Sequence, residues 1–264
     1  MNANSSQPDV FLLALALRVQ ALTKHFNGVK ALDGVSLEVR AGEVVALIGP
    51  NGAGKTTLFN IITGFIAADG GQVQVNGNDV THLRPHLMAK RGVARTFQNV
   101  RLIGGLTALD NVMLSFVGNP GEAIFTGLAL RPRRVGEMEA SYRIKARELL
   151  AEVGLEEKAS DLARELSYGQ QKLLTIACAL AASPAILLLD EPVAGVNPDL
   201  IVQILELVRR EAAKGRAIVL IEHNMQAVEE VAGRAIFMDA GRKIVEGTPS
   251  SVMADPRVLE AYLE

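Results

Sequence analysis

A glycine-rich run between residues 49 and 57 has the composition and spacing of a loop that binds phosphate. It reads Gly49-Pro50-Asn51-Gly52-Ala53-Gly54-Lys55-Thr56-Thr57 and lies between an apolar segment, 44–48, and a segment of helical pattern, 57–62. Glycines let the backbone curl so that successive N–H groups point at phosphates, and the N-terminus of the following helix attracts anions. We expect Lys55 to reach the β- and γ-phosphates of a nucleotide and Thr56 to bind Mg²⁺ through its hydroxyl. Further candidate contacts to the nucleotide are Gly49, Asn51, Gly52, Gly54 and Thr57.

Two acidic residues, Asp190 and Glu191, follow a second apolar segment, 186–189. Ligands of α/β sheets bind at the carboxyl ends of parallel strands, so we expect both carboxylates beside the phosphate-binding loop. Asp190 would hold Mg²⁺, directly or through water, and Glu191 would polarise the water that attacks the γ-phosphate.

A short polar turn precedes the apolar helical segment 173–180. It reads Leu166-Ser167-Tyr168-Gly169-Gln170-Gln171 and has the form of an anion site. Ser167 is also suited to cap the helix that follows, so a purely structural role stays open. His223, after the apolar segment 217–221, and Gln98 are further candidates, although a lone polar residue is more often part of the surface.

The elements that must position these residues form an α/β pattern. Three segments are continuously apolar, as expected of central parallel strands covered on both faces: 44–48, 186–189 and 217–221. Segments 15–22 and 31–39 also indicate strands, and the second alternates Val35, Leu37 and Val39 with polar neighbours. These two belong to a half-buried antiparallel layer. Apolar strands separated by helical segments predict an α/β core.

The pattern of buried strands is absent between residues 99 and 166, which predicts a helical subdomain there. Residues 137–153 indicate a charged helix with apolar positions on one side: Ala146, Leu149, Leu150 and Val153. Upstream lie Asn119-Pro120-Gly121 and the basic cluster Arg131-Pro132-Arg133-Arg134, where Pro and Gly argue against a long regular helix. We interpret the cluster as a solvated loop, with docking of a partner as the alternative. The chain is therefore divided, within one domain of residues 1–264, into a nucleotide-binding core, 15–98 and 167–264, and the helical subdomain 99–166.

The overall composition is that of an ordinary globular protein. Apolar residues make up 49% of the 264, yet the longest apolar run considered, 10–17, has eight residues where a membrane-spanning helix needs about 20. No Lys or Arg precedes this run, which argues against a secretory signal, and we interpret it as part of a buried first strand. The formal net charge is −2, whereas a nucleic-acid binder usually carries an excess of positive charge. The single cysteine, Cys178, lies in an apolar stretch and is expected to pack in the core, and a chain without disulfides suits the cytosol.

In their order and spacing these motifs resemble the ATP-binding cassette (ABC) ATPases over nearly the whole chain. The turn 167–171 is the most diagnostic part, because it resembles the Leu-Ser-Gly-Gly-Gln signature of that family. Tyr168 stands in place of the first Gly, and Ser167, Gly169 and Gln170 are retained. The resemblance implies an ATPase with a P-loop NTPase core: α/β, with a mostly parallel sheet, an antiparallel β layer and an α-helical subdomain.

The resemblance also implies roles for single residues. Phe26 resembles the aromatic residue that stacks on adenine, with a core phenylalanine as the alternative. Gln98 resembles the loop residue that contacts Mg²⁺ and the attacking water, and His223 resembles the switch histidine that contacts the γ-phosphate. Asn197 stands where many relatives have Asp, a departure that bears on communication between two ATP sites.

In this family the signature turn faces the P-loop of a second cassette. The resemblance therefore implies that the signature residues Ser167, Gly169 and Gln170 contact the ATP of a partner, which is a second copy or a sister ATPase subunit. ATP binding would close the pair, and hydrolysis with product release would open it.

Several stretches resemble the branched-chain amino acid uptake branch of the family: 92–102, 191–198 and 258–263, together with Tyr168. This implies integral membrane permease subunits as partners, and a cytoplasmic protein that is peripheral on the inner face of the cell membrane. The segment after Gln98, with Leu102, Ile103 and Leu106, would receive a helix of the permease or else pack within the helical subdomain.

Soluble cassette ATPases that act on ribosomes, or on DNA in repair and chromosome organisation, are the alternative. Ribosome-acting relatives usually carry two cassettes, and repair proteins usually interrupt the cassette with a long coiled coil. The chain has one P-loop and no sustained heptads, so no nucleic-acid partner is expected.

Overall fold

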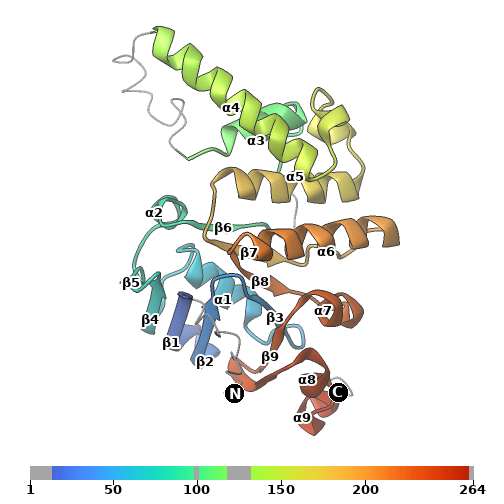
Figure 1. Cartoon of the computed structure of the whole chain (residues 1–264). Coiled ribbons are helices and arrows are strands. Elements are labelled where there is room, and N and C mark those ends of the chain that lie inside the picture. The colour runs from blue at the N-terminus through green and yellow to red at the C-terminus, as the bar shows by residue number, and fades with distance from the viewer. Residues whose placement is uncertain (1–13, 98–100, 118–131, 262–264) are drawn as a thin grey trace, which may run out of the picture.

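The structure is a computed structural model and describes residues 14–97, 101–117 and 132–261. The strands of its larger sheet are β3 (Val44–Ile48), β6 (Val93–Arg95), β7 (Ile186–Asp190), β8 (Ala217–Ile221), β9 (Arg234–Asp239) and β10 (Arg242–Gly247). A smaller antiparallel sheet contains β1 (Leu15–Phe26), β2 (Val29–Arg40), β4 (Gly70–Val75) and β5 (Asn78–Asp79). The strand orders are β10-β9-β3-β8-β7-β6 and β2-β1-β4-β5, and the two sheets lie in the lower half of the view in Figure 1.

Parallel pairing in the larger sheet brings the ends of three buried strands to one edge. Every residue of β3, β7 and β8 is buried. β8 pairs in parallel with β3 on one side and with β7 on the other, so that Leu47 and Asp190 both lie opposite Ile221. The prediction of central parallel strands is confirmed, and the residues that follow them emerge side by side.

Alternate residues of these strands enter two separate hydrophobic cores, because side chains of a strand point to opposite faces. Leu47, Leu188 and Ile221 belong to the core shared with the antiparallel sheet and with α1 (Lys55–Ile62). Leu189 and Leu220 belong to the core on the opposite face, which α6 (Pro198–Ala213) and α7 (Met225–Val231) help to form. This double covering is the reason that the strands are apolar at every position.

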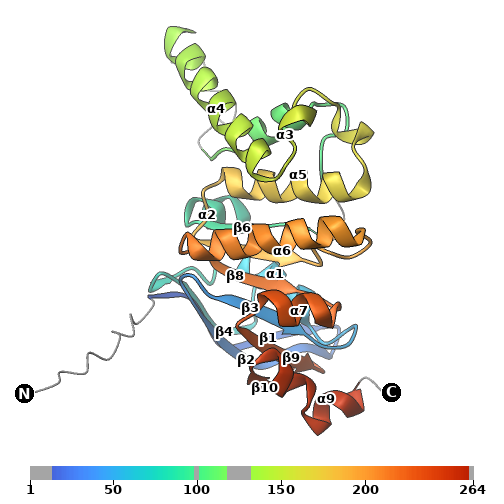
Figure 2. The same cartoon turned by 45° about the vertical axis from the view of Figure 1, so that its right-hand side comes forward.

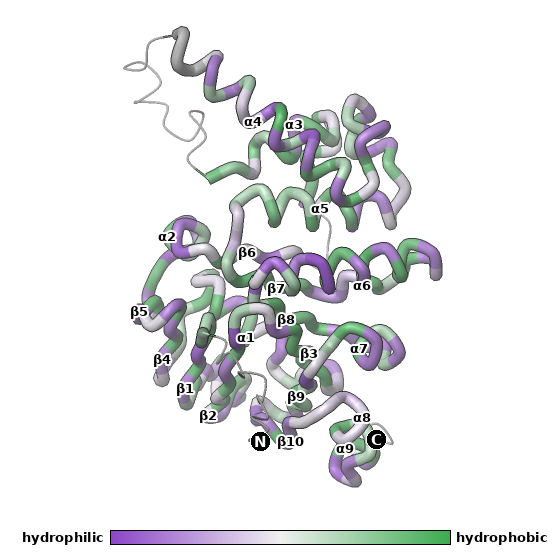
Figure 3. The backbone as a smooth tube through the Cα atoms, viewed as in Figure 1, coloured by the Kyte–Doolittle hydropathy of each residue, from purple (hydrophilic) through white to green (hydrophobic). Residues whose placement is uncertain are grey.

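A layer of helices lies beyond α6. It contains α3 (Ala108–Leu114), α4 (Pro132–Glu152) and α5 (Tyr168–Ala181), as Figures 1 and 2 show from two directions. Ala146, Leu150 and Val153 are buried, as the periodicity of 137–153 predicts. Figure 3 shows the alternation of hydrophilic and hydrophobic residues along α4. The division predicted from the sequence assigns α5 to the nucleotide-binding core, whereas in the structure α5 packs against both α3 and α4. The boundary of the helical subdomain at 99–166 stays a prediction.

The start of α4 differs from the sequence prediction. Residues 132–134 of the basic cluster lie in the first turn of this helix and not in a loop, so the loop prediction is wrong for them. Proline is tolerated there because the N–H that it lacks would have no intrahelical acceptor in the first turn. Arg131 and Asn119-Pro120-Gly121 lie outside the described residues.

The remaining helices are short. They are α2 (Pro85–Lys90), α8 (Pro249–Met253), α9 (Pro256–Ala261) and the 3₁₀ helices Glu156–Lys158 and Ala163–Glu165. Within the described ranges, every helix is too short or too polar to cross a membrane. Residues 15–17 of the apolar run 10–17 lie in β1, where Ala16 and Leu17 are buried; residues 10–13 lie outside the described part.

The thiol of Cys178 lies on α5 and packs partly buried against the core of the helical layer. Burial raises the pKa of Cys178 to about 11, against the opposing effect of a hydrogen bond with Ser115. An unperturbed thiol has a pKa of 9.0, so at a pH below 9 a much smaller fraction of Cys178 than of a free thiol is in the thiolate form.

We expect Cys178 to react slowly with Ellman's reagent at pH 8. The thiolate is the reactive form, and the raised pKa lowers its share about a hundredfold relative to the unfolded chain. The measurement is the rate of colour development for the native chain against the same chain in guanidinium chloride. Equal rates in the two states would contradict the buried, protonated thiol.

Candidate functional site

The phosphate-binding loop lies between the end of β3 and the start of α1 and is packed tightly on both sides. Gly49 and Gly54 have φ values of +144° and +97°, which L side chains rarely adopt. A Cβ on Gly49 would lie 2.0 Å from the carbonyl oxygen of Met238 in β9. A Cβ on Gly54 would lie 2.4 Å from the carbonyl oxygen of Ala31 in β2. The packing of the loop on both sheets therefore requires glycine at these two positions.

Lys55 begins α1, and its ammonium group folds back onto the loop. Nζ donates to the carbonyl oxygens of Gly49 at 2.6 Å and Pro50 at 2.8 Å, and the residue is 6% exposed. Burial lowers the pKa of Lys55, while the negative charges of Glu191 and Asp190 act in the opposite direction. The loop thus holds a cation at the point where the predicted phosphates would lie.

A cavity of about 310 Å³ opens beside the loop. It is lined by residues of the loop and of α1, and by the residues that follow β7 and β8. The helix N-terminus at this cavity favours anions. The structure brings together these predicted site residues: Asn51, Gly52, Gly54, Lys55, Thr56, Thr57, Glu191 and His223.

Glu191 and His223 face each other across this cavity. His223 Nε2 and Glu191 Oε1 are 3.3 Å apart, and both side chains are partly exposed. The backbone of Glu191 has a φ of +49°, a conformation that non-glycine residues adopt rarely and that clusters at functional sites. Its N–H donates to the carbonyl oxygen of Ile221 at 2.9 Å, which fixes the turn after β7 to the end of β8.

Asp190 is held by a partner that the sequence interpretation missed. Arg95 of β6 forms an ion pair with Asp190 at 2.6 Å, with both side chains almost fully buried, and also donates to Asn60 Oδ1 at 2.6 Å. The N–H of Asp190 donates to Thr96 Oγ1 at 3.1 Å. Asp190 is therefore fixed at the same sheet edge as Glu191 but is not among the residues that line the cavity.

The sequence offered one clue to Arg95. It lies three residues before Gln98, in a segment that could form a strand paired with 186–189. Gln98 itself lies outside the described residues, so its predicted role stays a prediction.

The turn at 167–171 forms a helix cap. Ser167 Oγ accepts from the N–H of Gln170 at 3.3 Å, and Gln170 Oε1 accepts from the N–H of Ser167 at 2.9 Å, which is a capping box. The structural role that the sequence left open is therefore present. Ser167, Gly169 and Gln170 are not among the residues that line the cavity at the P-loop of their own chain.

Phe26 and Asn197 lie at the edges of this region. Phe26 ends β1 and is 43% exposed, with Lys24 Nζ 5.3 Å from its ring centroid, so the alternative of a core phenylalanine is wrong. It is not a lining residue of the cavity. Asn197 caps α6, because its Oδ1 accepts from the N–H of Leu200 at 3.0 Å.

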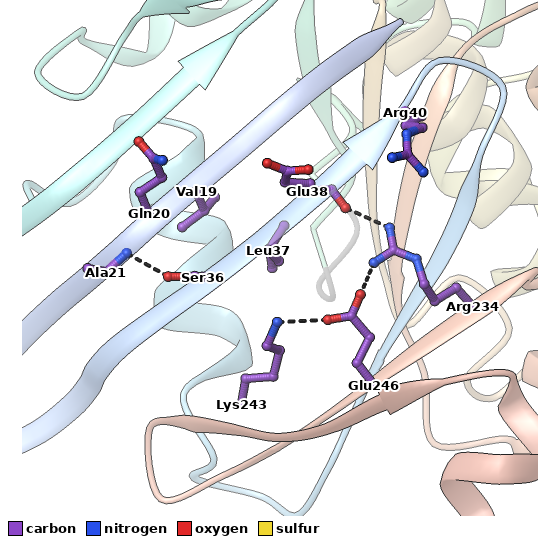
Figure 4. Close-up of a pocket in the computed structure, with 10 residues that line it drawn as sticks. All are labelled: Val19, Gln20, Ala21, Ser36, Leu37, Glu38, Arg40, Arg234, Lys243 and Glu246. Atoms are coloured by element: carbon purple, nitrogen blue, oxygen red, sulfur yellow. Dashed lines mark hydrogen bonds and ion pairs between the residues drawn. The ribbon is translucent and has the colours of Figure 1, made fainter. Parts of the chain in front are cut away.

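A second cavity, of about 550 Å³, lies between the antiparallel sheet and the β9–β10 hairpin (Figure 4). Three of its charged groups pair with one another or with the backbone: Arg234 bonds to Glu246 and to the carbonyl oxygen of Glu38, and Lys243 lies 2.7 Å from Glu246. The bond from Arg234 to Glu38 joins the hairpin to β2. Because Arg234 and Lys243 already bond to Glu246, the P-loop cavity is the better candidate for binding a nucleotide.

In sequence and in structure the chain is similar to known ATP-binding cassettes. The family described as "ABC transporter" matches residues 32–194, and "Branched-chain amino acid ATP-binding cassette transporter" matches residues 242–263. The high-affinity branched-chain amino acid transport ATP-binding protein BraF of Pseudomonas aeruginosa is 39% identical over 249 residues, covering 94% of this chain and 97% of that protein.

Two solved structures agree with this likeness. A nucleotide-free ATP-binding cassette from an ABC transporter has a TM-score of 0.82 and 35% identity, and the match covers 95% of this chain and 99% of that one. A cassette in its ADP conformation has a TM-score of 0.81 and 34% identity, with coverages of 94% and 98%.

We expect Gly49→Ala to lower the free energy of unfolding by about 3 kcal/mol, because the added Cβ meets a backbone carbonyl and the φ is unfavourable. The matched control is Gly136→Ala in α4, where a Cβ meets nothing within 4 Å and φ is not positive. The control should be neutral or more stable by up to about 1 kcal/mol. Chemical denaturation followed by circular dichroism measures both, and equal stabilities would contradict the packing described for the loop.

Proposed function

Because the chain belongs to the ATP-binding cassette (ABC) transporter family, we propose that its ATPase activity drives the import of branched-chain or related amino acids across a membrane. The observation that carries the proposal is the cavity in which Lys55, Glu191 and His223 meet beside the P-loop. The cargo is inferred from the likeness of residues 242–263 and of the whole chain to branched-chain amino acid cassettes.

The residues of the cavity are suited to bind a nucleoside triphosphate and to activate water. The loop N–H groups and Lys55 would bind the phosphates, with Gly49, Asn51, Gly52, Gly54 and Thr57 forming the surrounding cradle. Glu191 would accept a proton from the attacking water, and His223, 3.3 Å from it, would donate to the γ-phosphate. Phe26, exposed at the end of β1, would stack on the adenine.

The side chains near the loop also suit a magnesium ion. Thr56 lines the cavity, and Asp190 lies at the same sheet edge. A hydroxyl and a carboxylate supply the oxygen ligands that Mg²⁺ prefers. Gln98 is the third ligand implied by the family. A bound Mg²⁺ would neutralise part of the phosphate charge. Arg95, by holding one oxygen of Asp190, would fix the direction in which the carboxylate presents itself.

We propose that the active state is a pair of cassettes. Ser167, Gly169 and Gln170 do not line the cavity of their own chain, which fits a role toward the nucleotide of a partner. The capping box holds the turn in one conformation, with its N–H groups at the N-terminus of α5. The partner is a second copy or a sister subunit.

Two exposed apolar side chains, Phe65 and Ile103, are suited to contact a permease. Phe65 is 50% exposed and lies edge-on to Phe97, at 5.5 Å between ring centroids, and the guanidinium of Arg101 lies 3.8 Å from the Phe97 centroid. Ile103 is 54% exposed, whereas Leu102 packs against the core of the helical layer. We propose that a cytoplasmic helix of the permease binds Phe65 and Ile103 and so holds the protein at the inner face of the membrane.

A soluble cassette that acts on ribosomes or DNA is not favoured. The chain covers nearly the whole of an importer subunit, and its formal net charge is −2.

Uptake in cells tests the proposal. A strain that lacks this chain is supplied with the wild type, with Glu191→Gln, or with the control Glu206→Gln, an exposed residue of α6. The wild type and the control should restore uptake of radiolabelled leucine, isoleucine and valine, and Glu191→Gln should reduce it at least about tenfold, because loss of a general base costs 10²–10⁴ in rate. Full uptake with Glu191→Gln would reject the role of Glu191. Unchanged uptake of all three amino acids without the chain would reject the cargo.

A further inference from the structure

Lys172, in the second turn of α5, links the helix that begins at the signature turn to the backbone of Glu191 in the same chain. The residue is 4% exposed, and its Nζ donates to the backbone carbonyl oxygen of Glu191 at 2.9 Å. Its ammonium also lies 5.6 Å from the ring centroid of Tyr168. Burying an ammonium group is costly unless it is bonded, so this contact constrains both elements that it joins.

Two further contacts join the first turn of α5 to the segment after Glu191. A Cβ on Gly195 would lie 3.2 Å from Cε1 of Tyr168, so the tyrosine ring rests on this glycine. A Cβ on Gly169 would lie 2.4 Å from Cδ1 of Leu200, so the backbone of the signature turn packs directly on α6. α5 and α6 run side by side in both views (Figures 1 and 2). The signature turn therefore rests against the segment that begins at Glu191.

The same segment is held from its other side by β8 and the residue after it. The N–H of Glu191 donates to the carbonyl oxygen of Ile221, and the N–H of Val193 donates to Glu222 Oε1 at 2.9 Å. Glu191 thus keeps its unusual φ between two supports, β8 and α5. A movement of α5 relative to the sheet would act on Glu191 through Lys172.

We propose that Lys172 is a positioning residue that couples the signature turn to Glu191. The inference rests on the proposed function, in which Ser167 contacts the nucleotide of a partner cassette while Glu191 acts on the nucleotide of its own chain. Lys172 then connects the two ATP sites through one chain. When the signature turn contacts the partner's nucleotide, the position of α5 determines, through Lys172, the position of Glu191 in the ATP cavity of the same chain. Tyr168, which stands where the family signature has glycine, supports this link by packing on Gly195.

The experiment compares Lys172→Met, Lys172→Arg and the control Lys158→Met. Methionine fills the same buried space without a donor, and arginine keeps one. Lys158 is exposed on a 3₁₀ helix and pairs with Asp161, away from the site. The full-length chain is used, with ATP and Mg²⁺ for turnover and without nucleotide for hydrogen exchange.

We expect Lys172→Met to lower kcat about tenfold with KM for ATP changed less than about twofold, since misplacing a reacting group costs rate more than binding. Lys172→Arg should recover kcat to within about threefold of the wild type, because guanidinium can donate to the same carbonyl. Without nucleotide, the amides of residues 191–197 should exchange faster in Lys172→Met than in the wild type or in Lys158→Met.

The outcomes separate this inference from the proposed function. Unchanged kcat and unchanged exchange of 191–197 in Lys172→Met, beside a kcat that collapses in Glu191→Gln, would overturn the link alone. Normal turnover in Glu191→Gln would overturn the role proposed for Glu191 and, with it, the coupling. An equal fall of kcat in Lys172→Met and Lys172→Arg, with no change in exchange, would also overturn the proposal, because a missing donor would then not be the cause.

Discussion

The parallel pairing of β8 with β3 and β7 decides where every other part of the site can lie. Ile221 stands opposite both Leu47 and Asp190, so the P-loop, the acidic pair and His223 leave the sheet within two strand spacings of one another. Strand spacing in a sheet is about 4.8 Å, which is the scale of contacts to a triphosphate. Apolar strands covered on both faces make this register rigid. A slip of one residue would turn each of these side chains to the opposite face.

The signature turn is held apart from the P-loop cavity of its own chain. Its capping box and its packing on α6 fix it at the N-terminus of α5. Ser167, Gly169 and Gln170 do not line the P-loop cavity of their own chain. Under the proposed function, the second wall of the ATP site comes from another chain, and ATP would lie between the two chains. Lys172 would connect the two ATP sites, because α5, whose first turn would contact the partner's nucleotide, also bonds through Lys172 to the backbone of Glu191.

Sequence predicted those features that depend on local pattern. The glycines and Lys55 of the P-loop, the acidic pair after a buried strand and the amphipathic stretch of α4 are each set by spacing along the chain. The pairs Arg95–Asp190 and Lys172–Glu191 do not follow from local pattern, because they join residues 95 and 19 positions apart through tertiary packing. The start of α4 was missed because proline breaks a helix interior but suits its first turn. Phe26 could be placed on the surface only once the extent of β1 was known.

One chain is expected to hold half of an ATP site, and the molar mass of the protein with and without ATP tests this most directly. Glu191→Gln should bind ATP but hydrolyse it slowly, so the closed pair should accumulate. Light scattering on the purified variant should give a monomer of 28.2 kDa without nucleotide and, either alone or mixed with its sister ATPase subunit, a species of about twice that mass with ATP and Mg²⁺. Adding Ser167→Arg, which places a bulky side chain at the signature turn, should abolish that shift. A monomer of Glu191→Gln at saturating ATP both alone and with the sister subunit, or an unchanged dimer after Ser167→Arg, would contradict the pairing of two cassettes through ATP.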